Sequence, residues 1–369
     1  MSDETIYERL GVRRVINGMG TYTVLGGSLM PPEVLRAMTE AADAFVSIPD
    51  LREKIGARIA DLLGVPAAMV TSGAASAITV ATAACIVIGE NLGDLARLPN
   101  ASAIRNEVIL QTAHRTGYEP QIELTGAKLI WVETRDELDR AIRETTAMLF
   151  FLNFAEPLGK IGRAEWIEVG QTRGIPTFLD AAADVPPVSR LWEYVQEGFD
   201  LVAFSGGKGL RGPQSTGLLL GRVDLIALAE AAISPQDGIG RGMKVGKEEL
   251  AGLLAAVERY LTLDHEAEWR AWQARAEELV ERLSKHPAIR ATIDVPAIAN
   301  HAPQVMVTWD ETRCRSDAET ISRRLREGDP PIALLVEGPQ SLRIAAWTLR
   351  DDEVATVARR ILAELERFD

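Results

Sequence analysis

The sequence predicts an α/β protein with a mainly parallel, seven-stranded sheet between helices, followed by a smaller α+β domain. Seven short apolar runs without polar alternation lie between residues 67 and 220, and segments with charges at helical spacing separate them. A chain of 369 residues is long enough for one large core and a second, smaller domain. We expect an N-terminal arm over residues 1–30, a large α/β domain over 31–262 and the small domain over 263–369.

The seven apolar runs are the predicted strands of the large domain. Strands that helices cover on both faces lack polar positions, and strand–helix alternation is typical of a parallel sheet. The link between the last two runs has no obvious crossover helix, so the last strand can run antiparallel to its neighbour. The runs are Ala67–Thr71, Glu107–Gln111, Lys128–Val132, Ala147–Asn153, Ile175–Asp180, Phe199–Phe204 and Thr216–Leu220.

Helices are predicted from the spacing of their charges and from proline near a first turn. Pro31 and Pro32 begin the first helix, at positions where a missing N–H costs little. The strand-like runs Gln304–Trp309 and Leu342–Thr348 belong to the small domain. The other predicted helices are Arg135–Glu144, Ala164–Thr172, Lys247–Leu263, Glu266–Lys285 and Asp351–Phe368.

Composition and charge narrow the class of protein. Apolar residues make up 47% of the chain and charged residues 25%, as in ordinary globular proteins. The net charge of −13 would repel nucleic-acid phosphate, and no long basic run opposes it, so no nucleic-acid partner is expected. Cys85 and Cys314 are too few for a disulfide framework or a metal cluster. The first residues lack the apolar core of a signal peptide and no membrane span is predicted, so we expect a cytoplasmic protein.

One lysine stands out because glycines surround it directly after an apolar strand. Lys208 lies in Ser205–Gln214, a segment that contains four glycines. Glycine removes side-chain bulk and permits positive φ, so a flat ligand could approach the backbone, and open α/β sheets bind ligands at this edge. A lysine there can form an imine if its surroundings lower its pKa. The alternative is a lysine in a solvated loop.

Two neighbouring features suit the same ligand. Asp180 ends a strand and is followed by alanines, so it could pair with a protonated pyridine nitrogen, or else cap the next turn. Ser72, Gly73 and Ala74 connect a strand to a helix whose free N–H groups suit a phosphate, although such turns are also common for packing alone. Ser205 could supply a further hydroxyl. Together the three features are more specific than any one of them.

The chain resembles the fold-type-I pyridoxal-phosphate enzymes, which have the aspartate-aminotransferase-like fold. Within them it is most similar to the branch of selenocysteine synthase and the D-glucosaminate-type ammonia lyases. The similarity covers the first two thirds of the chain, with a looser match beyond. The matching stretches are Ile16–Thr21, Leu25–Ser28, Thr71–Ala75, Asp180–Ala183, Ser205–Gln214 and Gly240–Glu248.

This resemblance implies roles for individual residues. Lys208 would form the internal aldimine with pyridoxal 5'-phosphate, and Asp180 would face the pyridine nitrogen. The phosphate would lie at the turn with Ser205. His114 follows a strand where the fold often places a group stacked on the ring; a surface histidine is the alternative. The family's dimers share residues between sites, so a homodimer or higher homo-oligomer is expected.

Substrate-binding residues are predicted with less support from the sequence. Arg343, in the small domain, would fork onto a substrate carboxylate, or else pair with a surface acid. Arg241 and Lys244 lie in a glycine-rich stretch and could meet an anionic group. Thr21 and Tyr22 could offer hydroxyl contacts. No metal site is expected.

The resemblance favours a lyase that acts on a hydroxylated, possibly sugar-derived, 2-amino acid and releases ammonia and a 2-oxo acid. An aminotransferase or a racemase would differ only in the fate of one carbanion. A selenium transferase acting on tRNA is disfavoured by the negative charge and by the short segment before Ile16. A non-catalytic relative that binds pyridoxal phosphate and a nucleotide-binding α/β protein are the alternatives from other classes.

Overall fold

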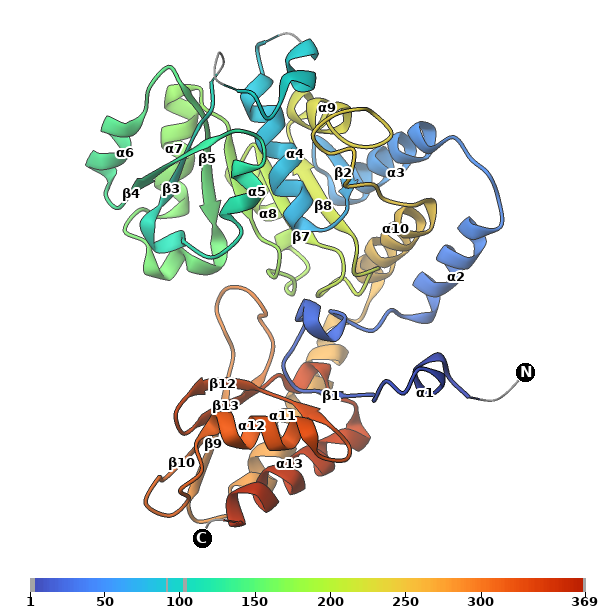
Figure 1. Cartoon of the computed structure of the whole chain (residues 1–369), viewed down its shortest axis with the longest axis vertical. Helices are drawn as coiled ribbons and strands as arrows, with labels where there is room; N and C mark the ends of the chain where they lie inside the picture. The colour runs from blue at the N-terminus through green and yellow to red at the C-terminus, as the bar shows by residue number, and fades with distance from the viewer. Residues whose placement is uncertain (1–3, 91, 102–104, 368–369) are drawn as a thin grey trace. The chain divides into compact units, whose positions relative to one another are not determined.

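The computed structural model describes residues 4–90, 92–101 and 105–367 (Figure 1). The described chain divides into two compact units. The larger unit comprises residues 29–262 and 298–300. The smaller unit comprises the remaining described residues, so the N-terminal residues up to Ser28 belong to the same unit as the C-terminal part of the chain.

The larger unit is built on one seven-stranded sheet, in which all neighbours are parallel except at β8. β8 runs antiparallel to β2 on one side and to β7 on the other, as the missing crossover helix allows. The mainly parallel seven-stranded sheet predicted from the sequence is therefore confirmed. In spatial order the strands are β2 (Ala67–Thr71), β8 (Gly217–Gly221), β7 (Leu201–Ser205), β6 (Thr177–Asp180), β5 (Thr146–Leu152), β3 (Glu107–Gln111) and β4 (Lys128–Val132).

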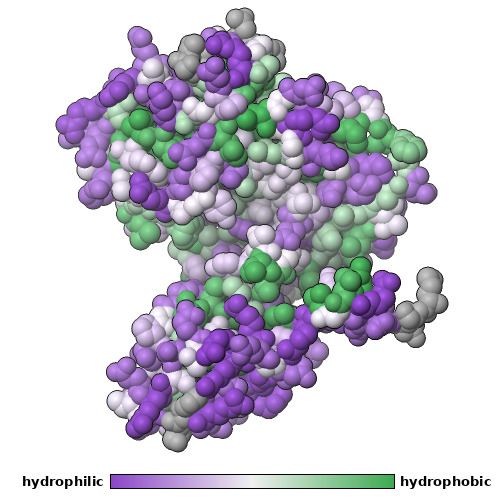
Figure 2. Space-filling model, viewed as in Figure 1, coloured by the Kyte–Doolittle hydropathy of each residue, from purple (hydrophilic) through white to green (hydrophobic). Residues whose placement is uncertain are grey.

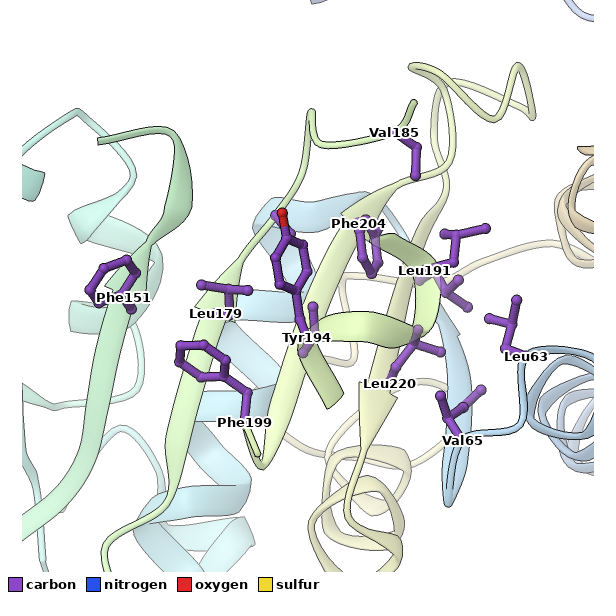
Figure 3. Close-up of a cluster of buried hydrophobic side chains, with 14 of the residues drawn as sticks. Leu63, Val65, Phe151, Leu179, Val185, Leu191, Tyr194, Phe199, Phe204 and Leu220 are labelled. Carbon is purple, nitrogen blue, oxygen red and sulfur yellow. The ribbon is translucent and has the colours of Figure 1, made fainter. Parts of the chain in front are cut away.

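Helices pack on both faces of this sheet, and this is why its strands read as continuous apolar runs. All residues of β5 are buried, and successive side chains alternate between two cores. Leu149 and Phe151 belong to the core on one face, and Met148 and Phe150 to the core on the other. Figure 3 shows part of the first core, where Phe151, Leu179 and Phe204 gather from neighbouring strands. The central strands of the sheet are thus shielded from solvent on both faces.

The helices of the larger unit follow the predicted order with small shifts at their ends. The predicted Arg135–Glu144 ends earlier, at Ala141, and the predicted Ala164–Thr172 extends by one residue at each end. In Figure 1 the almost wholly apolar α4 crosses the face of the sheet. The helices are α2 (Pro32–Ala42), α3 (Ile48–Leu63), α4 (Ala74–Val87), α5 (Glu119–Glu123), α6 (Arg135–Ala141), α7 (Arg163–Arg173), α8 (Arg190–Glu197), α9 (Val223–Ala231) and α10 (Lys247–Thr262), with 3-10 turns η2 (Leu92–Arg97), η3 (Thr112–His114) and η4 (Asn153–Leu158).

The smaller unit holds a four-stranded antiparallel sheet and three longer helices, which confirms the α+β prediction. Its sheet order is β12 (Leu335–Gly338), β13 (Ser341–Ile344), β10 (Gln304–Trp309) and β9 (Ile289–Asp294). The helices are α11 (His265–Leu283), α12 (Ala318–Glu327) and α13 (Asp351–Glu366), and the short elements are α1 (Ile6–Arg9), η1 (Thr23–Leu25), β1 (Ile16–Asn17), β11 (Ile332–Ala333) and η5 (Ala346–Thr348). β1 and β11 pair in parallel. The predicted end of the last helix, Phe368, lies outside the described residues.

One predicted strand of this unit is wrong in its second half. The run Leu342–Thr348 is split, because β13 ends at Ile344 and a 3-10 turn follows. The N–H of Ala345 donates to the carbonyl of Gly18, and the Thr348 hydroxyl donates to the carbonyl of Asn17, 2.7 Å away. Hydrogen bonds to this N-terminal segment therefore replace the sheet ladder after Ile344.

No helix within the described ranges is long and apolar enough to cross a membrane. On the face drawn in Figure 2, hydrophilic side chains predominate and apolar ones form small groups.

Candidate active site

Asp180 ends β6, in the interior of the seven-stranded sheet. It is paired with Leu152 of β5 on one side and with Ala203 of β7 on the other. Its carboxylate is buried and accepts a hydrogen bond of 3.0 Å from the N–H of Ala182. Burial raises the pKa of Asp180, and the Ala182 hydrogen bond and the charge of Lys208 oppose the rise. No ion pair of Asp180 occurs within the part of the chain that the structure describes.

Lys208 lies in the loop that follows β7, the strand beside β6. Burial lowers the pKa of its amine, and the negative charges of Asp180 and Asp184 raise it in part. A lysine held in this way gives up its proton more readily than one in water, and a neutral amine is both a nucleophile and a base.

Three of the glycines around Lys208 have a packing role that the sequence did not suggest, and their predicted role in ligand approach stays a prediction. A Cβ at Gly206, Gly207 or Gly209 would overlap protein atoms, namely the Thr216 side chain, the backbone of Gln214 and the carbonyl of Val185 respectively. These three glycines therefore let the loop fold tightly on its neighbours. The residue of the loop with positive φ is Arg211, at +58°, where the sequence would suggest a glycine.

The turn before α4 is open. Gly73 has a φ of +95°, in the left-handed region that favours glycine, and an added Cβ would meet nothing within 4 Å. Its carbonyl accepts hydrogen bonds from the Thr71 and Ser76 hydroxyls, at 2.9 and 3.3 Å. The first N–H groups of a helix have no partner within the helix, so this turn presents donors to an anion.

A glycine of β8, Gly217, allows Ser205 and the Gly73 turn to lie close together. Ser205 is the last residue of β7 and pairs with Gly217 of β8. A Cβ on Gly217 would overlap the carbonyl group of Gly73. The structure thus brings the predicted phosphate residues to the same end of the sheet as Lys208, which follows Ser205 by three residues.

His114 is buried, which excludes the alternative of a surface histidine. Its ring lies edge-on to Phe151, with centroids 4.5 Å apart, and its Nδ1 accepts a hydrogen bond from the N–H of Leu152 at 3.2 Å. Burial lowers the pKa of His114 to about 4, so the ring is neutral near pH 7. Its predicted stacking on a cofactor ring stays a prediction.

A buried polar network that the sequence did not suggest lies beside these residues. Asp184 Oδ2 accepts hydrogen bonds from the Tyr194 hydroxyl, at 2.9 Å, and from the Asn153 amide. Arg163 Nη1 donates to Asn153 Oδ1 at 2.7 Å. A sequence signal existed only at Asn153, a polar residue directly after the apolar run of β5.

The remaining predicted residues come from other segments of the chain. Arg241 and Lys244 are exposed in the segment between α9 and α10, and Arg241 Nη1 lies 3.1 Å from Ser234 Oγ. Thr21, Tyr22 and Arg343 belong to the smaller unit. The Arg343 guanidinium contacts carboxylates of Glu337 and Asp294, at 2.7 and 3.1 Å, which is the alternative considered from the sequence; its binding to a substrate carboxylate stays a prediction.

Comparison with known proteins places this chain in a family. The family model described as SelA, L-seryl-tRNA selenium transferase, matches residues 15–276. D-glucosaminate-6-phosphate ammonia lyase from Salmonella typhimurium is 31% identical over 335 residues, which are 88% of this chain and 87% of that protein. A 5'-C-glycyluridine monooxygenase-decarboxylase from a Streptomyces species is 32% identical over 341 residues, 89% of this chain and 83% of that one.

A solved structure agrees with the sequence comparisons. The structure of D-glucosaminate-6-phosphate ammonia-lyase superimposes with a TM-score of 0.85 at 29% identity and covers 100% of both chains. This chain therefore belongs to the L-seryl-tRNA selenium transferase family and has the aspartate-aminotransferase-like fold of the fold-type-I pyridoxal-phosphate enzymes.

Proposed function

We propose that this chain is a pyridoxal-phosphate-dependent lyase that removes ammonia from a hydroxylated, sugar-derived 2-amino acid and leaves a 2-oxo acid. The observation that carries the proposal is the half-buried Lys208, whose amine feels the charges of two buried carboxylates, Asp180 and Asp184, at one end of a mainly parallel sheet. The family and the similarity to an ammonia lyase support the same reaction class.

The residues present fit pyridoxal phosphate. The open turn at Gly73 offers helix N–H groups and the nearby Ser205 hydroxyl to a phosphate. Asp180 is a buried carboxylate that would pair with the protonated pyridine nitrogen, which relieves the cost of its burial. Lys208 would hold the cofactor's aldehyde carbon through its amine. When bound, the cofactor supplies an electron sink that acidifies the Cα–H of a 2-amino acid.

Lys208 is the base in this proposal. Burial lowers the pKa of Lys208 and so favours the neutral amine, which can accept the Cα proton of the substrate. Departure of the hydroxyl group at Cβ then removes water, and hydrolysis of the unsaturated product takes up water and releases ammonia. The net change is one 2-amino acid converted into one 2-oxo acid and one ammonia.

The proposed substrate class rests on the relative named for D-glucosaminate 6-phosphate and on the need for a leaving group at Cβ. A 2-amino acid derived from a sugar carries a hydroxyl at that carbon. Selenium transfer to a charged tRNA is less compatible with the net charge of −13.

Self-association is part of the proposal. Between residues 29 and 46 of the larger unit the apolar side chains Leu29, Leu35, Phe45 and Val46 are exposed, and Phe45 is fully so. Exposed apolar groups near one another commonly mark contact surfaces between proteins. Sedimentation of the purified chain should therefore give at least twice its mass of 40.2 kDa.

The reaction is tested by incubating the purified chain and pyridoxal phosphate with D-glucosaminate 6-phosphate, D-glucosaminate and both serine enantiomers. We expect ammonia and 2-oxo acid in equal amounts from at least one sugar-derived substrate, and none from Lys208→Ala. Amino-group transfer to an added 2-oxo acid would instead indicate an aminotransferase. Inversion alone would indicate a racemase, and oxygen uptake with release of carbon dioxide would match the Streptomyces relative's name. Cofactor binding without turnover of any substrate would favour a regulatory relative.

A further inference from the structure

We propose that Asp184 is a positioning residue that acts on Lys208 through its negative charge, and that Asn153, Tyr194 and Arg163 hold its carboxylate in place. The inference rests on the proposed role of Lys208 as the amine that carries the cofactor and moves the substrate proton. It adds a second carboxylate to the one, Asp180, that the sequence suggested.

The backbone ties the Asp184 segment to the Lys208 loop. Asp184 N–H donates to the carbonyl of Ala181, 3.1 Å away, and so closes a turn directly after β6. The next residue, Val185, contacts the loop so closely that a Cβ on Gly209 would overlap its carbonyl. Val185, which follows Asp184, and Gly209, which follows Lys208, therefore pack together without space between them.

The Asp184 carboxylate is fixed by donors from two other elements. Tyr194 of α8 donates its hydroxyl to Oδ2, and Asn153, the first residue of η4, donates its amide to the same oxygen. The Asn153 amide nitrogen also lies 2.8 Å from the Tyr194 oxygen, so the three groups form a closed set. Asn153, Asp184 and Tyr194 are all buried, at 0%, 3% and 2% exposure.

Arginines enclose the network from outside. Arg163 donates to Asn153 Oδ1 and is itself held by Glu156 Oε2, at 2.9 Å, and Glu197 Oε2, at 3.3 Å. The guanidinium groups of Arg163 and Arg190 lie over the Tyr194 ring, 5.2 and 5.3 Å from its centroid. Arg163 thereby fixes the Asn153 amide so that its NH2 group, not its oxygen, faces Asp184.

The charged and titratable groups that act on Asp184 come from each element around it. Burial has the largest effect and, together with the charge of Asp180, raises the pKa of Asp184 to about 6. The hydrogen bonds from Asn153 and Tyr194 and the charge of Arg190 lower this pKa and so limit the rise. Lys208 in turn feels Asp184 as a charge that favours its protonated form. Near neutral pH Asp184 is therefore charged, and below about pH 6 it loses the charge that holds the proton on Lys208.

This coupling gives a pH signature that packing alone cannot produce. The neutral fraction of an isolated amine rises tenfold per pH unit below its pKa. For Lys208 the rise should be shallower around pH 6, because Asp184 gains its charge there and raises the Lys208 pKa at the same time. A neighbouring charge of this kind shifts a pKa by about one unit or more.

The test measures Lys208 in the full chain freed of cofactor, so it does not depend on whether pyridoxal phosphate binds. Reductive methylation with formaldehyde and cyanoborohydride is followed from pH 5 to 8 by mass spectrometry of the peptide that contains Lys208. Asp184→Asn should abolish the shallow region near pH 6 and raise the labelling rate at pH 7 by about tenfold. Tyr194→Phe removes one donor to Asp184 and should move the shallow region to higher pH.

A matched control removes one negative charge elsewhere on the same unit. Asp224 lies in the first turn of α9, beyond the end of β7 opposite to Lys208, and pairs with Arg222. Asp224→Asn should therefore leave the Lys208 profile unchanged. Equal effects of Asp224→Asn and Asp184→Asn would overturn the proposal, and so would an unchanged profile in Asp184→Asn. If Asp184→Asn does not fold, Tyr194→Phe decides, and an unchanged profile there contradicts the role. If Asp184→Asn changes the Lys208 profile as expected but the chain never binds pyridoxal phosphate, the proposed function is refuted and the role of Asp184 stands.

Discussion

Partial loss of solvent around two groups of opposite charge explains the pKa shifts of Lys208 and Asp180. Desolvation disfavours the charged form of each, so it lowers the pKa of the amine and raises that of the carboxylic acid. Each group also favours the charge of the other, which limits both shifts. A ligand that takes over the amine and offers a positive ring nitrogen to the carboxylate would satisfy both groups at once.

His114 gives a prediction for stability against pH. Its pKa is about 4 in the folded chain and lies near 6.5 when exposed, so the unfolded chain binds more protons between these values. Folding stability from a neutral His114 is therefore present above pH 6.5 and is lost as the pH falls towards 4. His114→Gln should remove this loss, which amounts to up to about 3 kcal/mol.

Urea unfolding of both proteins at several pH values between 4 and 7.5 measures the effect. The free energy of unfolding of the original chain should fall relative to that of His114→Gln as the solution becomes more acidic. Parallel curves for the two proteins would show that His114 is not held neutral by burial.

Individual residues differ in how well the sequence could indicate them. Lys208 and Asp180 could be singled out because each directly follows a recognisable apolar strand. Asp184 could not, because an acidic residue before a pair of prolines is typical of a surface turn. Only tertiary packing buries it, with partners 31 residues before it and 10 residues after it.

At the level of elements, the strands of the larger unit were predictable because both of their faces are covered. β2, β3 and β4 have the predicted bounds, and the antiparallel β8 follows from its short link to β7. The sheet of the smaller unit was harder to predict. β9 alternates buried and exposed positions, and β12 has four residues, none of them buried, so neither forms an apolar run.

The contact between β8 and the start of α4 carries a prediction for cofactor binding. Gly217→Ala would place a Cβ against the Gly73 carbonyl and push the turn away from Ser205. Overpacking of a rigid contact costs about 1–3 kcal/mol, and a loss of about 1.4 kcal/mol weakens binding tenfold. We expect the affinity for pyridoxal phosphate, measured by absorbance titration, to fall by about tenfold.

Gly93→Ala is the matched control for this change. It adds the same methyl group at a glycine that has nothing within 4 Å of the added carbon. Its cofactor affinity should equal that of the original chain. Equal affinities for all three proteins would mean that the Gly73 turn does not hold the phosphate.

For the whole molecule, two separate units divide the predicted functional residues. The larger unit contains the lysine, both carboxylates and the open turn, and the smaller unit contains Arg343, Thr21 and Tyr22. The residues predicted to hold the cofactor therefore all belong to a single sheet with its helices and loops. The family match, over residues 15–276, covers this sheet entirely.

The most direct test of the account is the visible absorbance of the purified chain with pyridoxal phosphate, before and after borohydride reduction. We predict a band at roughly 410–430 nm, the region of a protonated imine, that reduction abolishes. Mass spectrometry should then find the reduced cofactor on the peptide that contains Lys208, and Lys208→Ala should lack the band. A colourless protein, or a reduced cofactor attached to another lysine, would contradict the central role of Lys208.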